Sequence, residues 1–294
     1  MTNEKINVTN SIKETREIIK KWKNSGLKVG FVPTMGYLHD GHESLIIRSA
    51  EENDKTVVSI FVNPTQFAPS EDFNSYPRNF DADKLICQNA GADLIFAPTA
   101  KEMYPEGSCT FVDMDKTSKG LCGKSRPTHF RGVSTVVNKL FNITTPNRAY
   151  FGQKDAQQLA VIKKMTTDLC IDVEIIGCPI VREADGLAKS SRNVYLSSEE
   201  RKAALVLSKA LNEGRLLIKS GECDKLKLLN EMEIIVNAEP LAKIDYIEIV
   251  DADSIEPIND LTHYKGNILI AIAVFIGKTR LIDNFIYNME ETAL

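Results

Sequence analysis

Five short apolar runs, separated by segments of helical periodicity, constrain the fold of this chain more than any other feature. The runs are Val29–Val32, Val57–Val62, Ala92–Pro98, Ala149–Gly152 and Glu174–Val181. Strands buried on both faces are typically continuous apolar runs rich in β-branched residues, and helices between consecutive strands are typical of a parallel sheet. The sequence therefore predicts an α/β fold with a doubly wound parallel sheet.

The composition changes after Val181. A polar stretch, READGLAKSSRN (182–193), precedes a long predicted helix at about 197–220, and two strand-like segments follow at Ile244–Val250 and Asn267–Ile276. Helices followed by strands predict a smaller α+β unit, and 294 residues are ample for two domains. We therefore expect a nucleotide-binding domain at residues 1–182 and a C-terminal α+β lid domain at residues 183–294.

The bulk composition argues against several classes of function. A formal net charge of −4 gives no overall attraction to nucleic acid or anionic lipid. The N-terminus lacks the apolar core of a signal peptide, and the longest apolar run, Ile268–Ile276, is too short to span a membrane. The six cysteines include no Cys-x-x-Cys pair, which predicts free thiols. We expect a cytoplasmic protein that acts on small molecules and binds neither nucleic acid nor membrane.

Two of the four histidines, His39 and His42, stand in the segment GFVPTMGYLHDGHESLI (30–46). The segment predicts a strand, a turn and a helix from Gly41 to Asn53, so both histidines fall at a helix N-terminus. Free N–H groups and the helix dipole attract phosphate or carboxylate there, and an imidazole adds a donor. Two alternatives stay open: one histidine only caps the helix and the other lies on the surface, or the pair is half of a metal site.

Polar clusters follow three of the predicted strands. They are VPTMGYLHDGH (32–42), VNPTQF (62–67) and GQKDAQQL (152–159). Ligands of a doubly wound sheet bind beyond the carboxyl ends of the strands, where the strand order reverses, so we expect the three loops to line one cleft. In the third loop Gly152 permits close backbone approach and Lys154 is a candidate phosphate ligand, whereas Asp155 is either a ligand or a helix cap.

Two further segments carry cations suited to anions. Five lysines and arginines lie between Lys116 and Arg131 with no acidic residue among them, which indicates an anion-binding segment, a mobile lid or a solvated basic loop. Arg126 and His129 are its stronger site candidates. The segment KSSRN (189–193) supplies hydroxyls and a guanidinium suited to a polyphosphate. A Gly-x-Gly-x-x-Gly fingerprint and a Walker A motif are both absent, which argues against a dinucleotide oxidoreductase and a P-loop ATPase.

In their order along the chain, these motifs closely resemble those of the pantothenate synthetase (pantoate-beta-alanine ligase) family. The matching motifs are PTMGYLHDGH, NPTQF, YPR, RPTHFRGV, FGQKDAQQL and VREADGLAKSSRN, and they cover nearly the whole chain. The resemblance implies the nucleotidyltransferase version of the Rossmann fold, related to class I aminoacyl-tRNA synthetases. HDGH then corresponds to the His-Ile-Gly-His signature of those enzymes, and KSSRN corresponds to their mobile Lys-Met-Ser-Lys-Ser loop. The resemblance also implies a homodimer.

The chemistry that the resemblance implies has two steps. The carboxylate of pantoate attacks the α-phosphorus of ATP to give pantoyl adenylate and pyrophosphate. The amine of beta-alanine then attacks the acyl carbon and expels AMP. Magnesium is expected to be carried on the phosphates, and the sequence assigns no protein ligand to it.

The resemblance also implies roles for individual residues. The catalytic set is His39, His42, Lys154 and Arg192, with His42 as the acid. Gln66 and Gln158 would hold pantoate, and Gln66 would also border the beta-alanine site. The residues expected to contact ATP are Met35, Gly36, Tyr37, Leu38, His39, Asp40, Gly41, His42, Gly152, Gln153, Lys154, Asp155, Val181, Lys189, Ser190, Ser191 and Arg192.

One position departs from the family pattern, and two other functions compete with the ligase. Lys189 stands where family members usually have Met, which leaves open whether its side chain reaches a phosphate or solvent. A non-catalytic nucleotide or RNA binder would have little use for Gln66 and Gln158, and the acidic composition disfavours RNA. A nucleotidyltransferase that releases the adenylylated compound would share the ATP site but not this pair of glutamines.

Overall fold

The computed structural model describes residues 6–69 and 71–292, which form two compact units. The first unit contains the residues up to Met114 together with Thr128–Gln153 and Val161–Pro179. The second contains Asp115–Pro127, Lys154–Ala160 and the chain from Ile180 onward. The division into domains at 1–182 and 183–294 remains our proposal. The compact units differ from it because Asp115–Pro127, Lys154–Ala160 and residues 180–182 belong to the second unit.

A six-stranded parallel sheet forms the centre of the first unit. Its strand order is β1-β4-β3-β2-β5-β6, and every pairing is parallel. The strands are β1 (Asn7–Thr9), β2 (Val29–Thr34), β3 (Lys55–Ile60), β4 (Leu94–Phe96), β5 (Arg148–Gly152) and β6 (Glu174–Cys178). The predicted doubly wound parallel sheet is confirmed, and each of the five predicted runs overlaps one of its strands. Strand β1 was missed because three residues are too few to show a periodic pattern.

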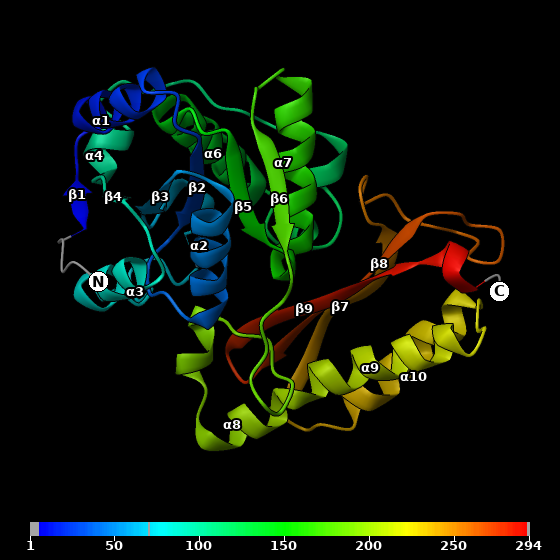
Figure 1. Cartoon of the computed structure of the whole chain (residues 1–294). Coiled ribbons are helices and arrows are strands. Elements are labelled where there is room, and N and C mark those ends of the chain that lie inside the picture. Colours follow the sequence, from blue (N-terminus) through cyan, green and yellow to red (C-terminus); the bar gives the residue numbers. More distant parts are fainter. Residues whose placement is uncertain (1–5, 70, 293–294) are drawn as a thin grey trace. The chain divides into compact units, whose positions relative to one another are not determined.

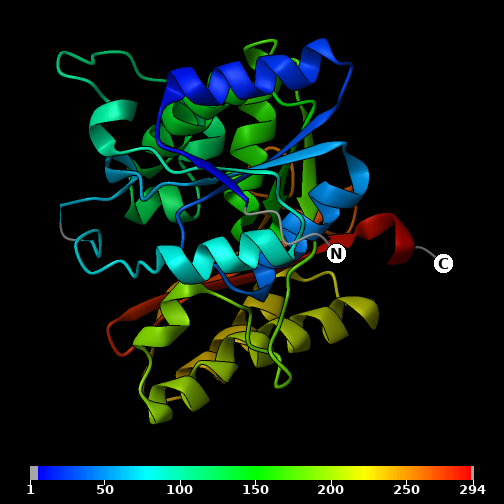
Figure 2. The same ribbon diagram turned by 60° about the vertical axis from the view of Figure 1, so that its left-hand side comes forward.

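Helices cover both faces of this sheet (Figures 1 and 2). The helices of this part of the chain are α1 (Ile12–Asn24), α2 (Asp40–Glu52), α3 (Phe80–Asn89), α4 (Ala100–Met103), α6 (His129–Thr144) and α7 (Ala156–Asp168). On one face Val32 of β2 packs in a cluster with Ile46 of α2. On the other face the ring of Phe31 lies 6.4 Å from that of Phe141 in α6. Successive side chains of a strand point to opposite faces, so a strand with helices on both sides is apolar throughout.

The strand order reverses between β2 and β5. From β2 the sheet continues through β3 and β4 in one direction, whereas β5 and β6 lie in the other, with Phe31 paired to Ala149. The carboxyl ends of β2 and β5 are therefore neighbours at one edge of the sheet. Open parallel sheets bind their ligands at this reversal. The loops that follow β2 and β3, and the residues that follow β5, all leave from this edge.

The second unit contains a three-stranded antiparallel sheet with the strand order β7-β8-β9. The elements are α5 (Cys122–Ser125), α8 (Ser198–Ala203), α9 (Leu205–Lys219), α10 (Lys225–Asn237), β7 (Ala242–Asp251), β8 (Asn267–Ile276) and β9 (Thr279–Asn288). Helices α9 and α10 cover one face (Figure 1). The other face of β8 is also buried, where Leu269 packs with Leu121 and Ala160. Burial on both faces explains the continuous apolar run that predicted β8, and the smaller α+β unit is confirmed.

Strand β9 and the interruption of the long helix were not predicted. The expected helix at about 197–220 is two helices, α8 and α9, that meet at Ala204. Strand β9 contains Arg280, Asp283 and Asn284, and these polar residues hid its apolar pattern. Asp283 and Asn284 are nevertheless buried, at 3% and 4% exposure, because partners from distant segments satisfy them.

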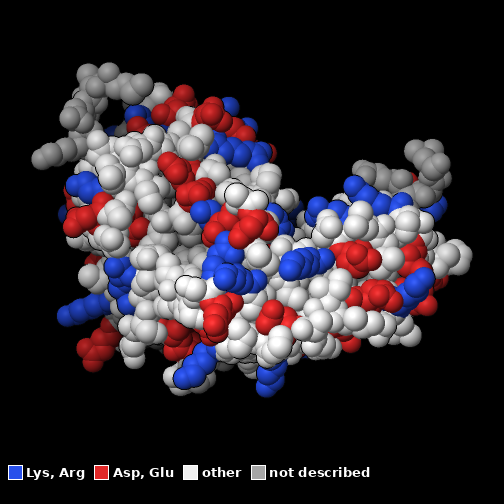
Figure 3. Space-filling view, turned by 90° about the horizontal axis from the view of Figure 1, so that it is seen from below, with Lys and Arg blue, Asp and Glu red and all other residues white. Residues whose placement is uncertain are grey.

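The helices, the cysteines and the surface charges of the described residues complete the description of the fold. No helix among them is both long enough and apolar enough to cross a membrane. The six cysteines are unpaired; Cys87, Cys122 and Cys178 are buried, and Cys109 and Cys170 are exposed. On the face drawn in Figure 3, lysine and arginine side chains are interspersed with aspartate and glutamate.

Candidate active site

The two histidines of the HDGH segment cap helix α2 together. His39 is the N-cap residue, and its Nδ1 accepts a hydrogen bond from the Gly41 N–H at 3.1 Å. His42 completes a reciprocal pair, because its Nδ1 accepts from the His39 N–H at 3.4 Å, and the two ring centroids lie 4.1 Å apart. Both histidines therefore contribute to the cap, and their contact with ATP stays a prediction.

This cap determines which nitrogen of each ring can donate. A ring nitrogen that accepts a hydrogen bond carries no proton, so each neutral imidazole has its proton on Nε2. Each histidine can then act as a cap through Nδ1 and as a donor through Nε2 at the same time. The alternative of a metal site would need further ligands beside His39 and His42. The described residues contain no cluster of three or more His, Cys, Asp or Glu that could hold a metal ion.

Asp83 of α3 fixes the turn that precedes His39. Its carboxylate accepts the Tyr37 N–H at 2.9 Å and the Leu38 N–H at 2.7 Å, and the residue is only 2% exposed. Gly36 and Tyr37 have φ angles of 80° and 52°, so the turn passes through the left-handed region. Burial raises the pKa of the Asp83 carboxyl, and the two backbone hydrogen bonds oppose that rise.

The sequence contained a signal for Asp83 that was not used. The residue lies four positions before Cys87, and both are buried on the same face of α3. An acidic side chain on the buried face of a helix needs hydrogen-bond donors, because an unpaired buried charge is costly. Here the donors are the two backbone N–H groups of the turn that carries His39.

Gln66 joins the loops that follow β2 and β3. It ends the short 3₁₀ helix η1 (Pro64–Gln66), is 7% exposed, and donates from Nε2 to the Met35 sulfur at 2.9 Å. The Nδ2 of Asn63 donates to its Oε1 at 3.1 Å. The structure thus brings together two of the three loops that were expected to share a cleft.

Residues that sequence reasoning had not singled out hold Gln66 in place. Asn63 is 1% exposed and also donates to the Gly132 carbonyl at 3.2 Å, while its Oδ1 accepts from the Tyr104 hydroxyl at 2.9 Å. Gly132 has no room for a side chain, since a Cβ there would lie 2.6 Å from the Gln66 Cα. His129, a candidate from the basic segment, has its Nδ1 2.9 Å from the Gln66 carbonyl oxygen. Contacts with residues distant in the sequence therefore fix the position of Gln66.

The turn that contains Lys154 belongs to the second unit. The Lys154 side chain is 19% exposed, and its Nζ lies 3.3 Å from Asp155 Oδ2. The Lys154 carbonyl accepts from Asn284 Nδ2 of β9 at 2.8 Å. Gln158 is half-buried in the first turns of α7. The backbone of this turn is therefore anchored to β9, and its cation is held beside an acid.

Gln157 has a structural role that its neighbour Gln158 does not share. It is 5% exposed, and its Nε2 donates to the carbonyls of Thr117 at 3.1 Å and Gly120 at 2.7 Å. Its Oε1 accepts the Cys122 N–H at 3.0 Å. One amide thus binds the first part of the basic segment to the beginning of α7.

Two cations of the basic segment have acidic partners from outside it. Lys124 Nζ lies 2.6 Å from Glu248 Oε1 of β7, and Lys119 forms an ion pair with Asp115. Arg131 stacks over the ring of Phe111 at 4.1 Å. The acidic partners lie outside residues 116–131, so the sequence of that segment alone did not predict these ion pairs.

The READGLAKSSRN segment folds back on itself as a hairpin. The Lys189 N–H donates to the Val181 carbonyl at 2.9 Å, which brings these two predicted ATP contacts together. Ser190 caps the 3₁₀ helix η4 (Ser191–Tyr195), with its hydroxyl accepting the Arg192 N–H at 3.3 Å. Ser191 is 6% exposed. The backbone of this segment is therefore fixed by its own hydrogen bonds, and it carries a lysine, two serines and an arginine at four successive positions.

The predicted site residues therefore fall into two sets. The first unit contains Met35, Gly36, Tyr37, Leu38, His39, Asp40, Gly41, His42, Gln66, Gly152 and Gln153, whereas the second contains Lys154, Asp155, Gln158, Val181, Lys189, Ser190, Ser191 and Arg192. Within the first set Gln66 donates to the sulfur of Met35, which lies in the same loop as the HDGH residues. Within the second set the hairpin joins Val181 to Lys189.

Comparison with known proteins identifies the family. The family model described as pantoate-beta-alanine ligase matches residues 7–286. A pantothenate synthetase of Clostridium botulinum is 55% identical over 284 residues, which cover 97% of this chain and 100% of that protein. A pantothenate synthetase of Enterococcus faecalis is 55% identical over 280 residues, or 95% of this chain and 98% of that protein.

Solved structures give the same result. The crystal structure of pantothenate synthetase from Thermus thermophilus has a TM-score of 0.88 at 43% identity, covering 95% of this chain and 99% of that one. A pantoate-beta-alanine ligase from Francisella tularensis, complexed with beta-gamma ATP and beta-alanine, has a TM-score of 0.78 at 36% identity, covering 97% and 98%. The chain belongs to the pantoate-beta-alanine ligase family and is a ligase.

Proposed function

We propose that this chain joins pantoate to beta-alanine and that ATP drives the reaction. The products are pantothenate, AMP and pyrophosphate, and pantoyl adenylate is the intermediate. The observation that carries the proposal is the His39–His42 pair at the N-terminus of α2, at the edge of the sheet where the strand order reverses. Such an edge, with a helix N-terminus beside it, suits the phosphates of a nucleotide.

In the first step negative charge builds on the α-phosphate and the leaving pyrophosphate. We assign His42 as the donor to the α-phosphate through Nε2, and His39 as a second donor at the same helix N-terminus. Lys154 and Arg192 are assigned to the β- and γ-phosphates. Donors that are already held in place stabilise such charge without reorganisation, and loss of one donor typically costs about 100-fold or more in rate.

The nucleotide and pantoate assignments follow the same division. Met35, Gly36, Tyr37, Leu38, Asp40, Gly41, Gly152, Gln153, Asp155, Val181, Lys189, Ser190 and Ser191 are assigned to ATP. Gln66 and Gln158 are assigned to pantoate, and Gln66 also to beta-alanine. An amide both donates and accepts, which suits a ligand with hydroxyls and a carboxylate.

In the second step the amine of beta-alanine attacks the acyl carbon of pantoyl adenylate, a C–N bond forms, and the bond to AMP breaks. The protein positions the two substrates, and its anion-binding groups stabilise the departing phosphate. A magnesium ion on the ATP phosphates would neutralise part of their charge. Mg²⁺ commonly binds through substrate phosphates and water with few protein ligands.

We also propose that the protein is a homodimer and works in the cytoplasm. The dimer proposal rests on the family resemblance, and sedimentation equilibrium of the purified chain tests it. The cytoplasmic proposal rests on the composition and on the family, whose reaction uses small molecules.

Pyrophosphate release separates the possible reactions. The purified chain is incubated with ATP and magnesium, then with pantoate, and then with beta-alanine. We expect pyrophosphate release that requires pantoate but not beta-alanine, and AMP release and pantothenate formation that require both. Pantoate-dependent pyrophosphate with no AMP on adding beta-alanine would indicate a nucleotidyltransferase, and no pyrophosphate at all would refute the proposal.

The Gln66→Ala variant tests the pantoate assignment. Loss of one hydrogen bond to a charged ligand costs about 1.5 to 3 kcal/mol, so pantoate KM or kcat should change about tenfold or more while ATP binding changes little. Gln88→Ala, on α3, serves as the matched control.

A further inference from the structure

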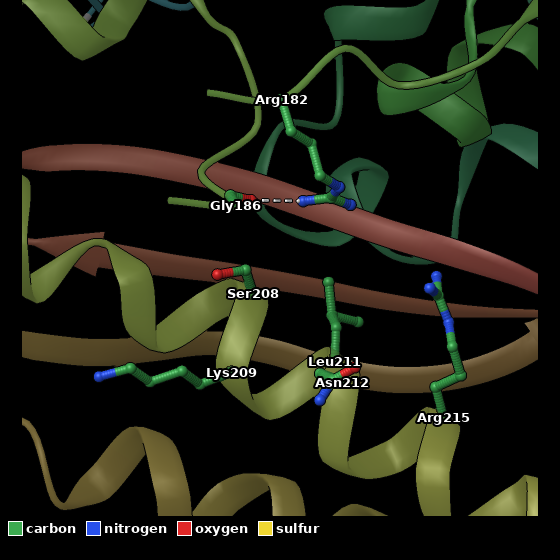
Figure 4. Close-up of a pocket in the computed structure, with 7 residues that line it drawn as sticks. All are labelled: Arg182, Gly186, Ser208, Lys209, Leu211, Asn212 and Arg215. Atoms are coloured by element: carbon green, nitrogen blue, oxygen red, sulfur yellow. Dashed lines mark hydrogen bonds between the residues drawn. The ribbon is translucent and has the colours of Figure 1, made fainter. Parts of the chain in front are cut away.

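We propose that a cavity in the second unit is a binding site for a small molecule that carries a phosphate group, separate from the residues assigned to ATP and pantoate. The cavity has a volume of about 350 Å³ and lies between the 182–186 loop and helix α9 (Figure 4). Its lining residues are Arg182, Gly186, Ser208, Lys209, Leu211, Asn212 and Arg215. Among these described residues three are cationic and none is acidic.

Two arginines of the lining are held in place by the same strand. Arg182 donates from Nη1 to Asp283 Oδ2 at 2.6 Å and from Nη2 to Asp283 Oδ1 at 2.8 Å. The guanidinium of Arg215 lies 4.7 Å from the centre of the Phe285 ring. Asp283 and Phe285 are two residues apart on β9, so both side chains point to the same face of the strand. The fold therefore anchors the two guanidinium groups at points about 7 Å apart along β9, a distance set by the strand repeat.

The loop that closes the cavity is fixed as well. Arg182 also donates to the Gly186 carbonyl at 3.0 Å. Arg201 of α8 pairs with Asp185 at 2.9 Å and with Glu183 at 2.6 Å. These ion pairs hold the 182–186 loop without using Arg215. Arg182 and the 182–186 loop are thus restrained, which lowers the entropy that a ligand must overcome on this side of the cavity.

The charges and the volume of the cavity favour an anion that is larger than a single phosphate group. Asp283 balances the charge of Arg182, and Arg215 has no acidic or carbonyl partner among the described residues, so an excess positive charge remains. A guanidinium presents planar, paired donors that match a phosphate. In Figure 4 Arg182 and Arg215 both extend toward β9, whereas Lys209 points away along the helix. The cavity is larger than one phosphate, and Leu211 and Asn212 offer apolar and polar contacts to an organic body.

Strand β9 connects this cavity to the turn that contains Lys154. Asn284, between Asp283 and Phe285, points to the opposite face and donates to the Lys154 carbonyl at 2.8 Å. A ligand that pulls Arg182 or Arg215 therefore acts on the strand that anchors this turn. We infer that occupancy of the cavity changes the KM for ATP, a consequence that rests on the proposed function.

The binding test uses inorganic phosphate as the probe, with its dissociation constant measured by ³¹P NMR titration. The variants are Arg215→Gln, which removes a lining cation, and Lys219→Gln, which makes the same charge change at an exposed position of α9 outside the cavity. Lys154→Met removes the cation assigned to ATP. We expect Arg215→Gln to weaken phosphate binding at least about tenfold, and the other two variants to bind within about twofold of wild type.

Three results would overturn the site: equal binding by Arg215→Gln and wild type, equal weakening by Arg215→Gln and Lys219→Gln, or loss of binding in Lys154→Met alone. If Arg215→Gln fails to fold, Ser208→Glu tests the same cavity. It places a carboxylate in the lining and keeps the Arg215–Phe285 contact. Weakened phosphate binding by Ser208→Glu supports the site, and unchanged binding refutes it.

The second measurement concerns the coupling alone. Pantoate-dependent pyrophosphate release is measured with and without phosphate, in wild type and Arg215→Gln. A phosphate-dependent shift of the ATP KM in wild type that is absent in Arg215→Gln supports coupling through β9, and phosphate binding without that shift refutes it. If no pyrophosphate forms under any condition, the proposed function fails, while the binding test of the cavity still stands.

Discussion

Replacement of Asp83 by asparagine tests how the fold positions the turn that precedes His39. The two carboxylate oxygens of Asp83 each accept one backbone N–H, from Tyr37 at 2.9 Å and Leu38 at 2.7 Å. Asparagine keeps the size of the side chain but replaces one oxygen with an NH₂ group, which can only donate. One of the two N–H groups then faces a donor in a site that is 2% exposed.

The expected magnitude follows from two opposing effects. A buried N–H left without an acceptor costs about 1 to 3 kcal/mol. Asparagine also removes the cost of burying a carboxylate, which is the cause of the raised Asp83 pKa. We therefore expect the free energy of unfolding to fall by about 1 to 2 kcal/mol at pH 7. Displacement of catalytic groups by about 1 Å can cost about 100-fold, so pantoate-dependent pyrophosphate release should fall at least about tenfold.

The pH dependence of this difference has a definite sign. The folded state holds the Asp83 proton to a higher pH than the unfolded chain does, because the folded pKa is raised above the ordinary value of 3.8. The stabilisation from this group is therefore complete below pH 3.8 and is lost as the pH rises through the folded pKa. The asparagine variant has no such titration. The stability advantage of wild type over Asp83→Asn should accordingly be larger near pH 4 than at pH 7.

Urea unfolding and pyrophosphate release are measured for wild type, Asp83→Asn and a matched control. Asp81→Asn makes the same change at an exposed position in the first turn of α3, and we expect its stability to stay within about 0.5 kcal/mol of wild type. If Asp83→Asn unfolds at the same urea concentration as Asp81→Asn and keeps the wild-type rate, the Asp83 hydrogen bonds do not position the turn.

Three further predictions concern the catalytic pair, the Gln66 loop and the hairpin. His42→Ala should slow adenylation about 100-fold or more while lowering the unfolding free energy by only about 1 kcal/mol for the lost cap contact; near-normal turnover with a much lower melting temperature would show that His42 is a cap alone. Gly132→Ala should destabilise the protein by about 1 to 3 kcal/mol in thermal unfolding, because its Cβ would overlap the Thr65 carbonyl oxygen; unchanged stability would mean that this loop yields. Lys189→Met should leave the pre-steady-state adenylation rate nearly unchanged, since the resemblance implies Met at this position; a drop of about tenfold that disappears at high salt would instead reveal a phosphate contact.

The sequence predicted the elements whose burial leaves a periodic or continuous pattern. Strands β2 to β6 lie between two layers of helices, so each is an apolar run that can be read without knowledge of its partners. The first turn of α2 was equally readable, because the strand, turn and helix signals are adjacent in the chain. The ordered motifs also identified the family, which the comparisons confirm.

The positions of the side chains around the candidate site depended on the tertiary structure. Gln157 and Gln158 are the same residue type at adjacent positions, yet only Gln157 is buried with three hydrogen bonds to the 117–122 segment. Adjacent residues of a helix point in directions about 100° apart, so the packing around the helix decides which one is enclosed. The packing involves residues that are distant in the sequence, so the sequence around Gln157 did not predict which glutamine is buried.

The doubly wound sheet, the smaller α+β unit and the family could all be predicted, because each of them leaves a signal in neighbouring residues. The contacts of Asp83 with the turn before His39 and of Asp283 with Arg182 could not be predicted, because the partners are 45 and 101 residues apart. A buried polar group must find its partner wherever the fold brings a matching group within hydrogen-bond distance, and that distance bears no relation to separation along the chain.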